Sequence, residues 1–321
     1  MRIVITKRLE APLWMKIGVR AFALGGAFLV MGIMFLAYGL NPIEVYKKIF
    51  LSGFGSIRGF SEAIVKMIPL LLCGLGLSLA FKAQFWNIGA EGQLVMGAIA
   101  AAKVVYSLKE GSSWVLIPAM FLAGFAAGAL WGLIPAILKA KFRLNEVVIT
   151  LMMNYIAIYF LLYLIYGPWR AKEQWGGMQW AGFPHTPLFP ESAWLPTIPG
   201  TRVHYPTLIL GLVSLVVLYI LLWKSSIGYE VRVVGDNPEA ARFAGIDQLK
   251  VLSLVMLISG GLAGLAGVGE VAGIQHRLRP GFSIGYGYTA IIVAWLGALN
   301  PAFIPLSSFL LGGLLVGTDV I

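Results

Sequence analysis

Charged residues and cysteine are both scarce in this sequence. Asp, Glu, Lys and Arg make up 12% of the 321 residues, roughly half their share in a soluble domain, whereas hydrophobic residues reach 59%. Cys73 is the one cysteine, so no internal disulfide can form and cysteine usage indicates no compartment. The histidines at positions 185, 204 and 276 lack metal-ligand spacing, and we predict no metal site.

The glycine-rich phosphate loop G-x-x-x-x-G-K-[ST] is missing as well. We therefore predict no catalytic residues and no cofactor bound by this chain, which is not expected to be an enzyme. If ATP drives its activity, the ATP and Mg²⁺ must be bound by a separate ATPase subunit.

Long apolar runs are abundant. Several reach the length of about 20 residues that a helix needs to cross a bilayer, where backbone groups find partners only within their own helix. The sequence therefore predicts an all-α polytopic membrane protein with about 8–9 transmembrane helices. We place them at about 19–40, 61–81, 84–106, 112–138, 148–167, 205–223, 250–271, 286–299 and 301–318.

The net charge of +10 reflects basic residues near membrane ends rather than a nucleic-acid surface, since no basic stripe is interleaved with aromatics. The apolar run 21–40 is too long for a signal peptide and lacks an A-x-A-like cleavage site. Five basic residues before it predict a cytoplasmic N-terminus in a multi-pass cell-membrane protein: Arg2, Lys7, Arg8, Lys16 and Arg20.

Small residues recur every four positions in two of the apolar runs. Such rows let helix backbones approach closely in lipid, so we expect them to pack helices rather than to carry chemistry. The rows are Gly124, Gly128 and Gly132; Gly260 and Gly264; and Ala263 and Gly267.

The segments 74–93 and 260–287 share a plan: a glycine-rich helix, a polar interruption and a second glycine-rich stretch. In our topology their leading helices run in opposite directions, which is typical of an inverted repeat with broken helices near the midplane. We predict one permease domain, 1–321, with repeats at about 61–167 and 205–321. An outer loop at 168–204, with six prolines, lies between them.

Polar residues interrupt the apolar sequence at FWNIGAEGQLVMG, residues 85–97. Burying Glu91 in a bilayer costs several kcal/mol unless it finds a partner or water, and Asn87 and Gln93 also need hydrogen bonds. Two interpretations stay open. The segment lines a water-accessible path for substrate, or Glu91 accepts backbone N–H groups at a broken helix end.

Other candidates for the path are Glu270, in the matching part of the second segment, and the aromatic residues Phe85 and Trp86. The two aromatic rings could stack on a base. We expect the neighbouring Arg277 and Arg279 to lie in a solvated outer loop.

A short polar helix is predicted within GDNPEAARFAG, residues 235–245, in the loop 225–249. Asp236 or Asn237 can cap it, Pro238 suits its first position, and Gly245 can close it. About two turns are too short to span a membrane.

The run Glu239–Gly245 matches the E-A-A-x-x-x-G core of cytoplasmic loops in ABC importer permeases. The runs AFKAQFWNIGAEGQLVMGAIAA (80–101) and NEVVITLMMNYIA (145–157) are similar to the nucleoside-type, basic-membrane-protein-associated subgroup of that family. The chain therefore resembles a permease subunit of the ribose, branched-chain amino acid and nucleoside type. Family members usually continue with a further apolar helix, so we expect this chain to be truncated.

The resemblance implies a bacterial or archaeal inner-membrane importer for a small polar solute, most simply a nucleoside. It implies a second permease subunit, homologous or identical, two cytoplasmic ATPase subunits, and an external substrate-binding protein or lipoprotein. The ATPase would dock on the short helix, through Asn237, Pro238, Glu239, Ala240, Ala241, Arg242 and Gly245.

Three alternatives remain: a ribose-type sugar permease, an ion-coupled secondary transporter, and a non-transporting membrane scaffold or receptor component. The second follows from the possible inverted repeat and from Glu91 in the membrane. Uptake driven by an ion gradient without an ATPase would identify it.

Overall fold

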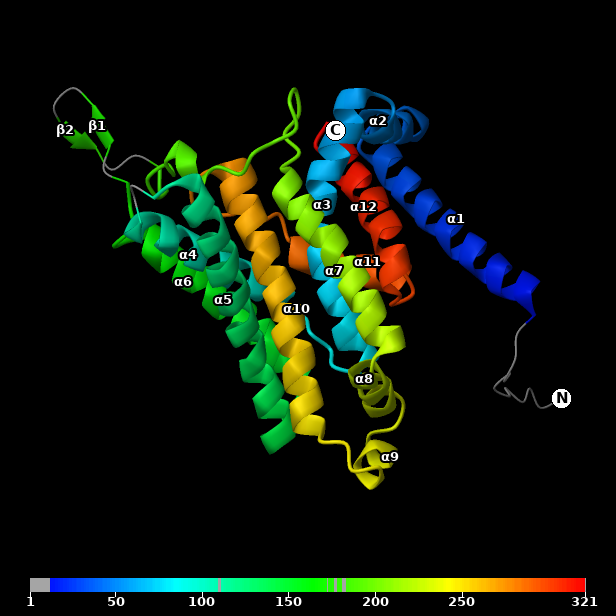
Figure 1. Ribbon diagram of the computed structural model, residues 1–321. Helices are drawn as coiled ribbons and strands as arrows, with labels where there is room; N and C mark the ends of the chain where they lie inside the picture. Colours follow the sequence, from blue (N-terminus) through cyan, green and yellow to red (C-terminus); the bar gives the residue numbers. More distant parts are fainter. Residues whose placement is uncertain (1–11, 109–110, 172, 176–177, 181–182, 321) are drawn as a thin grey trace.

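The computed structural model describes residues 12–108, 111–171, 173–175, 178–180 and 183–320. Helices form nearly all of its regular structure, as predicted (Figure 1). The main helices are α1 (Leu13–Ala37), α2 (Pro42–Phe54), α3 (Ile57–Lys82), α4 (Ala90–Ser107), α5 (Ser113–Phe142), α6 (Glu146–Tyr166), α7 (Tyr205–Lys224), α8 (Ser226–Asp236), α9 (Pro238–Phe243), α10 (Gln248–Glu270), α11 (Tyr286–Leu296) and α12 (Ile304–Thr318).

The count of 8–9 spans is wrong. Within the described residues six helices are long and apolar enough to cross a membrane, or seven if the pair 25–37 and 42–54, bent by 113°, forms one span. Two of the predicted spans differ from the structure. Residues 84–106 form a loop followed by α4, and residues 286–299 contain only α11, which has 11 residues. A helix of that length reaches about 17 Å, roughly half the hydrocarbon core.

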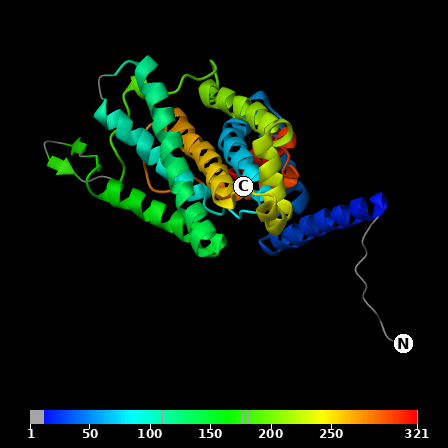
Figure 2. The same cartoon turned by 60° about the horizontal axis from the view of Figure 1, so that its bottom comes forward.

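α1 extends away from the other helices toward the N-terminal end of the chain (Figures 1 and 2). Three of the basic residues used to orient the chain, Arg2, Lys7 and Arg8, lie outside the described residues. The cytoplasmic N-terminus therefore stays a prediction.

Close packing of α4, α5 and α10 forms the centre of the fold. The small-residue rows lie at these contacts: a Cβ at Gly128 would lie 2.2 Å from the Gly260 carbonyl oxygen, and one at Gly97 would lie 2.3 Å from that of Gly264. Helix backbones approach this closely only where side chains are absent. The predicted packing role of these glycines is confirmed.

The segment between α6 and α7 contains a short antiparallel hairpin of β1 (Glu173–Trp175) and β2 (Met178–Trp180). Its later part binds the chain that follows α10: Thr186 N–H donates to Leu278 O at 3.0 Å, and Phe189 N–H donates to His276 O at 2.8 Å. These bonds satisfy backbone groups that no helix or sheet pairs.

One end of the helix bundle carries α8 and α9, and the other carries the segment between α6 and α7 (Figure 1). The end of α5 and the starts of α6 and α10 also lie toward the α9 end. The structure therefore has two distinct ends, and the short polar helix is at one of them.

Candidate functional site: a helix break inside the bundle

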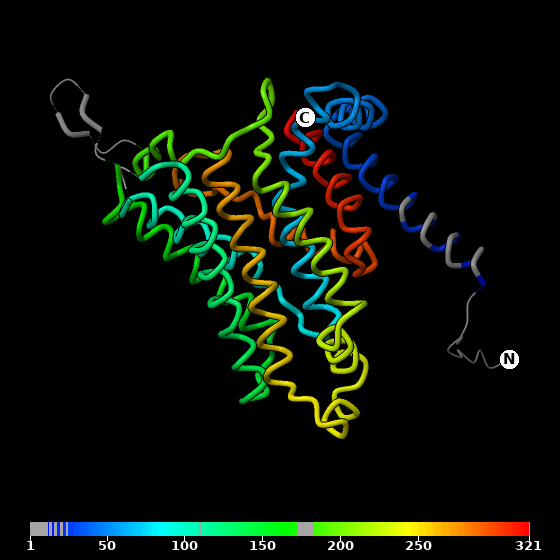
Figure 3. Tube along the Cα trace, viewed as in Figure 1, coloured from blue at the N-terminus to red at the C-terminus, as the bar shows by residue number. Residues whose placement is uncertain are grey.

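The helical structure is interrupted by a loop between α3 and α4, inside the bundle; we call this loop the helix break. α3 ends at Lys82, and Gln84 then takes a left-handed conformation with φ 52°, which turns the backbone back between the helices (Figure 3). Phe85 and Asn87 in this loop are fully buried. Buried irregular backbone is tolerated at membrane depth only if its polar groups find partners.

Asn87 is the centre of the loop's hydrogen bonds. Its Nδ2 donates to Gln93 Oε1 at 3.0 Å and to Ser259 Oγ of α10 at 3.1 Å. Its Oδ1 accepts from Gln93 Nε2 at 3.1 Å and from the N–H of Gly89 at 3.0 Å. The paired amides of Asn87 and Gln93 thus satisfy each other and connect the loop to α4 and α10.

Residues of α6 satisfy the backbone around the start of α4. Asn154 Oδ1 accepts from Gly92 N–H at 2.8 Å, and Asn154 Nδ2 donates to Ile88 O at 2.8 Å and to the Tyr288 hydroxyl at 3.0 Å. Thr150 Oγ1 accepts from Ile88 N–H at 3.3 Å. The unpaired groups that every helix end leaves are therefore bound by side chains from another helix.

Glu91 lies where the starts of α4 and α11 meet. It is 4% exposed, and its Oε2 accepts from Gly287 N–H of α11 at 2.8 Å. A Cβ at Gly287 would lie 2.2 Å from the Glu91 nitrogen, so only glycine permits this approach. A carboxylate between two helix N-termini is electrostatically favourable. Glu91 therefore accepts a backbone N–H at a helix start, as the second interpretation of this segment predicted. Contact of Glu91 with substrate stays a prediction.

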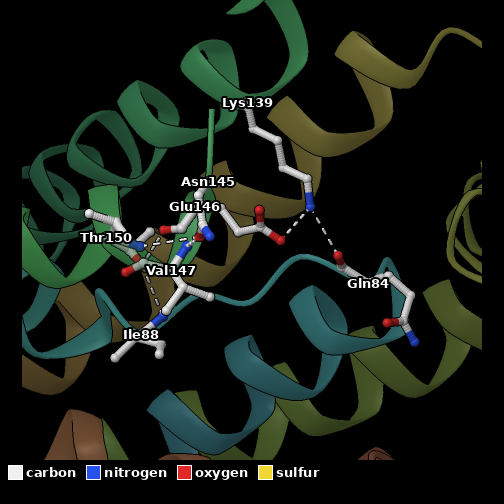
Figure 4. A network of polar contacts seen from close by, with 8 residues as sticks. Gln84, Ile88, Lys139, Asn145, Glu146, Val147 and Thr150 are labelled. Atoms are coloured by element: carbon white, nitrogen blue, oxygen red, sulfur yellow. Dashed lines mark hydrogen bonds and ion pairs between the residues drawn. The ribbon is translucent and has the colours of Figure 1, made fainter. Parts of the chain in front are cut away.

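Lys139 of α5 binds the first part of the break, just after α3 (Figure 4). Its ammonium lies 2.6 Å from Glu146 Oε1, donates to Gln84 O at 3.0 Å, and sits 4.9 Å from the centre of the Phe85 ring. Asn145 caps α6 beside it by accepting from Val147 N–H at 2.9 Å. One charged group thus joins the end of α5 and the start of α6 to the loop.

We expect Lys139→Met to destabilise the fold by about 1–3 kcal/mol, because the partly buried Glu146 carboxylate and the Gln84 carbonyl lose their donor. Lys139→Arg keeps the charge and should cost less. Thermal unfolding in detergent measures both, with the exposed Lys141→Met as the matched control on the same turn. Equal unfolding temperatures for the Lys139 and Lys141 methionine variants would contradict the role of Lys139.

The two aromatic candidates differ in their surroundings. Phe85 is fully buried under Lys139. Trp86 is 41% exposed and stacks on Trp295 at the end of α11, with ring centres 5.8 Å apart, and Phe81 lies 5.5 Å from Trp86. Of the two, only Trp86 therefore presents a ring face that another molecule could reach.

Glu270 lies apart from the break, at the end of α10, and accepts from Gln275 Nε2 at 3.1 Å. It lines a separate cavity at the end of the bundle opposite α9. The six predicted path residues are therefore divided between two places: five around the break, and Glu270 beside this cavity.

The sequence at Gly281–Gly285 reads G-F-S-I-G, which fits the spacing of a hydrolase nucleophile turn. That motif needs a strand before the serine and a helix after it. Ser283 instead follows a loop after α10, and its Oγ accepts from the N–H of Gly285 at 3.4 Å. The structure supplies no nucleophile geometry here. No cluster of three metal-ligating side chains occurs in the described part of the chain.

The short polar helix is present as α9. Asn237 Oδ1 accepts from the N–H groups of Glu239 and Ala240, both at 3.0 Å, Pro238 holds the first position, and Gly245 has φ 77°. These predictions of its ends are confirmed, except that Asp236 is the last residue of α8 rather than a cap.

The surface of α9 is exposed apart from Ala241, which is fully buried. Phe243 is 94% exposed at its tip. Gln248 Nε2, at the start of α10, donates to Pro238 O at 2.6 Å. α9 is therefore tied to the central helix α10 while its outer face is free of contacts within the described chain.

Sequence reasoning missed the partners of the break: Lys139, Thr150, Asn154, Ser259 and Gly287. Thr150 and Asn154 do lie in the run 145–157 that carried the resemblance. Their spacing of four residues on one helix face was the available signal.

The model of the branched-chain amino acid transport system permease component family matches residues 59–321. The chain is 34% identical to the glucose ABC transporter permease protein TsgB13 of Haloferax volcanii, over 97% of this chain and 82% of that protein. It is 32% identical to the nucleoside permease protein NupB of Lactococcus lactis (94% and 84%), whose strain also has a second matching permease, NupC.

It is also 35% identical to the guanosine ABC transporter permease protein NupP of Bacillus subtilis, over 89% of this chain and 80% of that protein. No solved structure matches. The family match covers most of the chain and includes the helix break, α9 and α10. The chain therefore belongs to the family of permease components of branched-chain amino acid transport systems.

Proposed function

We propose that this chain is the membrane-spanning permease subunit of an ABC importer for nucleosides. The observation that carries the proposal is its similarity, over most of its length, to permeases named for nucleosides and for guanosine. The similarity to a glucose permease makes glucose the second candidate. The cell membrane is the location that its apolar helices and its family support.

The proposed path runs beside the break between α3 and α4. The meeting of two helix starts at Glu91 supports it, because transporters of several folds place substrate near such interrupted helices. It also supports the proposed inverted repeat of about 61–167 and 205–321, since one helix start comes from each part. Asn87, Gln93 and Trp86 are the path residues we propose beside Glu91.

The proposed partners are a second permease, two cytoplasmic ATPase subunits that bind ATP and Mg²⁺, and an external substrate-binding protein. The exposed face of α9 is the proposed ATPase contact. Its bond to α10 through Gln248 would pass movement of α9 to the helix that holds Asn87.

The test is co-purification with the neighbouring ATPase, followed by uptake of labelled uridine or guanosine into proteoliposomes containing the complex and the binding protein. Phe243→Ser and Gly245→Val should reduce ATPase retention and uptake at least tenfold. The first removes an exposed apolar contact, and the second strains a left-handed residue. Trp114→Ser is the control, since Trp114 is 89% exposed at the far end of α5.

Uptake of uridine and ATPase retention that both survive in the two α9 variants would contradict the docking role. Uptake of glucose but of no nucleoside would replace the substrate and leave the permease role intact. Uptake that needs an imposed ion gradient and no ATPase would overturn the proposal in favour of a secondary transporter.

A further inference from the structure

A polar cavity of about 200 Å³ lies at the end of the bundle opposite α9. Its walls come from α3, the end of α10 with the π-helical turn Val271–Gln275, and the segment before α11. Its polar lining consists of Lys66, Arg202, Glu270, Gln275, Arg279 and Tyr286. The helix break does not contribute to it, so it is a second polar site.

Glu270 is the one carboxylate among these lining residues. Its side chain is 5% exposed, and Oε1 accepts from Gln275 Nε2 at 3.1 Å. Two of the three cations that line the cavity are paired elsewhere: Lys66 Nζ lies 3.4 Å from Asp319, and Arg202 binds Glu62 through Nε at 2.9 Å and Nη2 at 2.5 Å. The third, Arg279, acts on Glu270 electrostatically without an ion-pair contact to it. Glu270 therefore remains a buried acceptor that no ion pair neutralises within the described chain.

A carboxylate with a free lone pair, held in place by an amide, is the group with which proteins bind the hydroxyls of a ribose ring. Gln275 fixes the carboxylate, and Arg279 and Tyr286 offer donors from the other walls. The volume is below the range of about 300–1,000 Å³ typical of whole drug-sized ligands, so it fits a single ring. The carboxylate acceptor and the guanidinium and hydroxyl donors together can bind the hydroxyls of a polyol.

We propose that this cavity is an entry subsite that binds the sugar ring of the transported solute, with Glu270 accepting hydrogen bonds from adjacent ring hydroxyls. The proposal rests on the proposed function, since it takes the solute to be a nucleoside or sugar. It names the part of the solute that the permease recognises and places that recognition away from the helix break.

The pair of Arg202 and Glu62 lies at the entrance to this subsite. Arg202 lines the cavity and also a wide surface groove formed by Arg58, Ser61 and Gly200 among others. The hydrogen bonds that Arg202 donates to the Glu62 carboxylate raise the pKa of Arg202 above its ordinary value. Arg202 is 60% exposed but binds Glu62 through two hydrogen bonds, so a solute that enters must compete with Glu62 for the guanidinium. On its inner side the cavity reaches Tyr286, next to the Gly287 that binds Glu91.

The test places a reporter cysteine in the cavity of the full transporter, reconstituted with its ATPase in proteoliposomes. In a Cys73→Ala background, Ile274→Cys puts a thiol on the cavity wall and leaves Glu270 and Gln275 in place. A membrane-impermeant maleimide then labels it with and without D-ribose, uridine or uracil. Ser61→Cys in the groove is the matched control.

We expect ribose and uridine to slow labelling of the Ile274→Cys thiol severalfold, uracil to leave it unchanged, and the Ser61→Cys thiol to respond to none of them. Adding Glu270→Gln should raise the ribose concentration for half-protection about tenfold, as expected when a carboxyl acceptor of hydrogen bonds is replaced by an amide. Glu270→Asp keeps the carboxyl group, so we expect a smaller rise in the ribose concentration for half-protection.

Protection by uracil but not ribose, or no protection by either ribose or uridine, would overturn the subsite. Unchanged ribose protection in the Glu270→Gln variant would overturn the role of that carboxylate. The labelling needs no uptake, so ribose protection in a transporter that imports no nucleoside supports the subsite while contradicting the nucleoside substrate. Uptake of uridine without protection by ribose would contradict the subsite and support the nucleoside substrate.

Discussion

Replacing Gly264 with alanine should prevent the protein from reaching a stable fold. A Cβ at this position would lie 2.1 Å from the carbonyl oxygen of Gly124 in α5, well inside the closest contact that real side chains make. The same residue faces Gly97 of α4 from the other side. Neither neighbour is a flexible side chain, so whole helices must move apart.

We expect a cost of about 3 kcal/mol or more, because overpacking between rigid backbones also breaks the contacts of α10 with both α5 and α4. The measurements are the yield of monodisperse protein in detergent and the midpoint of thermal unfolding. Gly26→Ala in α1 is the control, since a Cβ there meets nothing within 4 Å. A Gly264→Ala protein with the unfolding midpoint of the Gly26→Ala protein would contradict this account of the central packing.

Local sequence predicted the parts of this fold whose causes are local. The glycine rows at Gly128 and Gly260 indicated close packing because small residues matter through their own missing side chains. The ends of α9 followed from Asn237, Pro238 and Gly245, each of which acts on backbone within a few residues.

Prediction from the sequence failed where residues far apart in the chain determine the local structure. The hydropathy of 84–106 and of 286–299 indicated spans, but Asn154 and Thr150 of α6 and Gly287 of α11 supply the partners that let these stretches break inside the bundle. Those pairs are 62 to 196 residues apart. No periodicity in a single sequence reports them, and the helix count was too high for this reason.

Polar residues in the apolar sequence did identify the place of the break. Asn87 lies in the break, and Glu91 and Gln93 lie in the first turn of α4 beside it, because an amide or carboxylate inside a membrane helix needs a partner and marks where regular structure ends. Their spacing could not show that Glu270 lies in a different cavity, since this depends on the path of the chain after α10.

Replacing Asn87 with leucine should destabilise the protein by about 2–4 kcal/mol. The variant leaves the buried amide of Gln93 without either of its bonds to Asn87 and removes the partner of Ser259. Gln93→Leu should cost a similar amount for the same reason. Thermal and denaturant unfolding in detergent give the stabilities, and Ser259→Ala, which loses a single bond to Asn87, is the milder control.

The double variant Asn87→Leu/Gln93→Leu separates the two interpretations of this segment. With both amides gone no buried group of the pair is left unsatisfied, so we expect the double variant to be about 0.5–3 kcal/mol more stable than the sum of the single losses predicts. If the amides serve structure alone, ATP-driven uptake returns with stability. Because we place the path here, we expect uptake to remain at least tenfold reduced in a double variant that folds. If stability and ATP-driven uptake both recover in the double variant, Asn87 and Gln93 serve the fold and do not belong to the path.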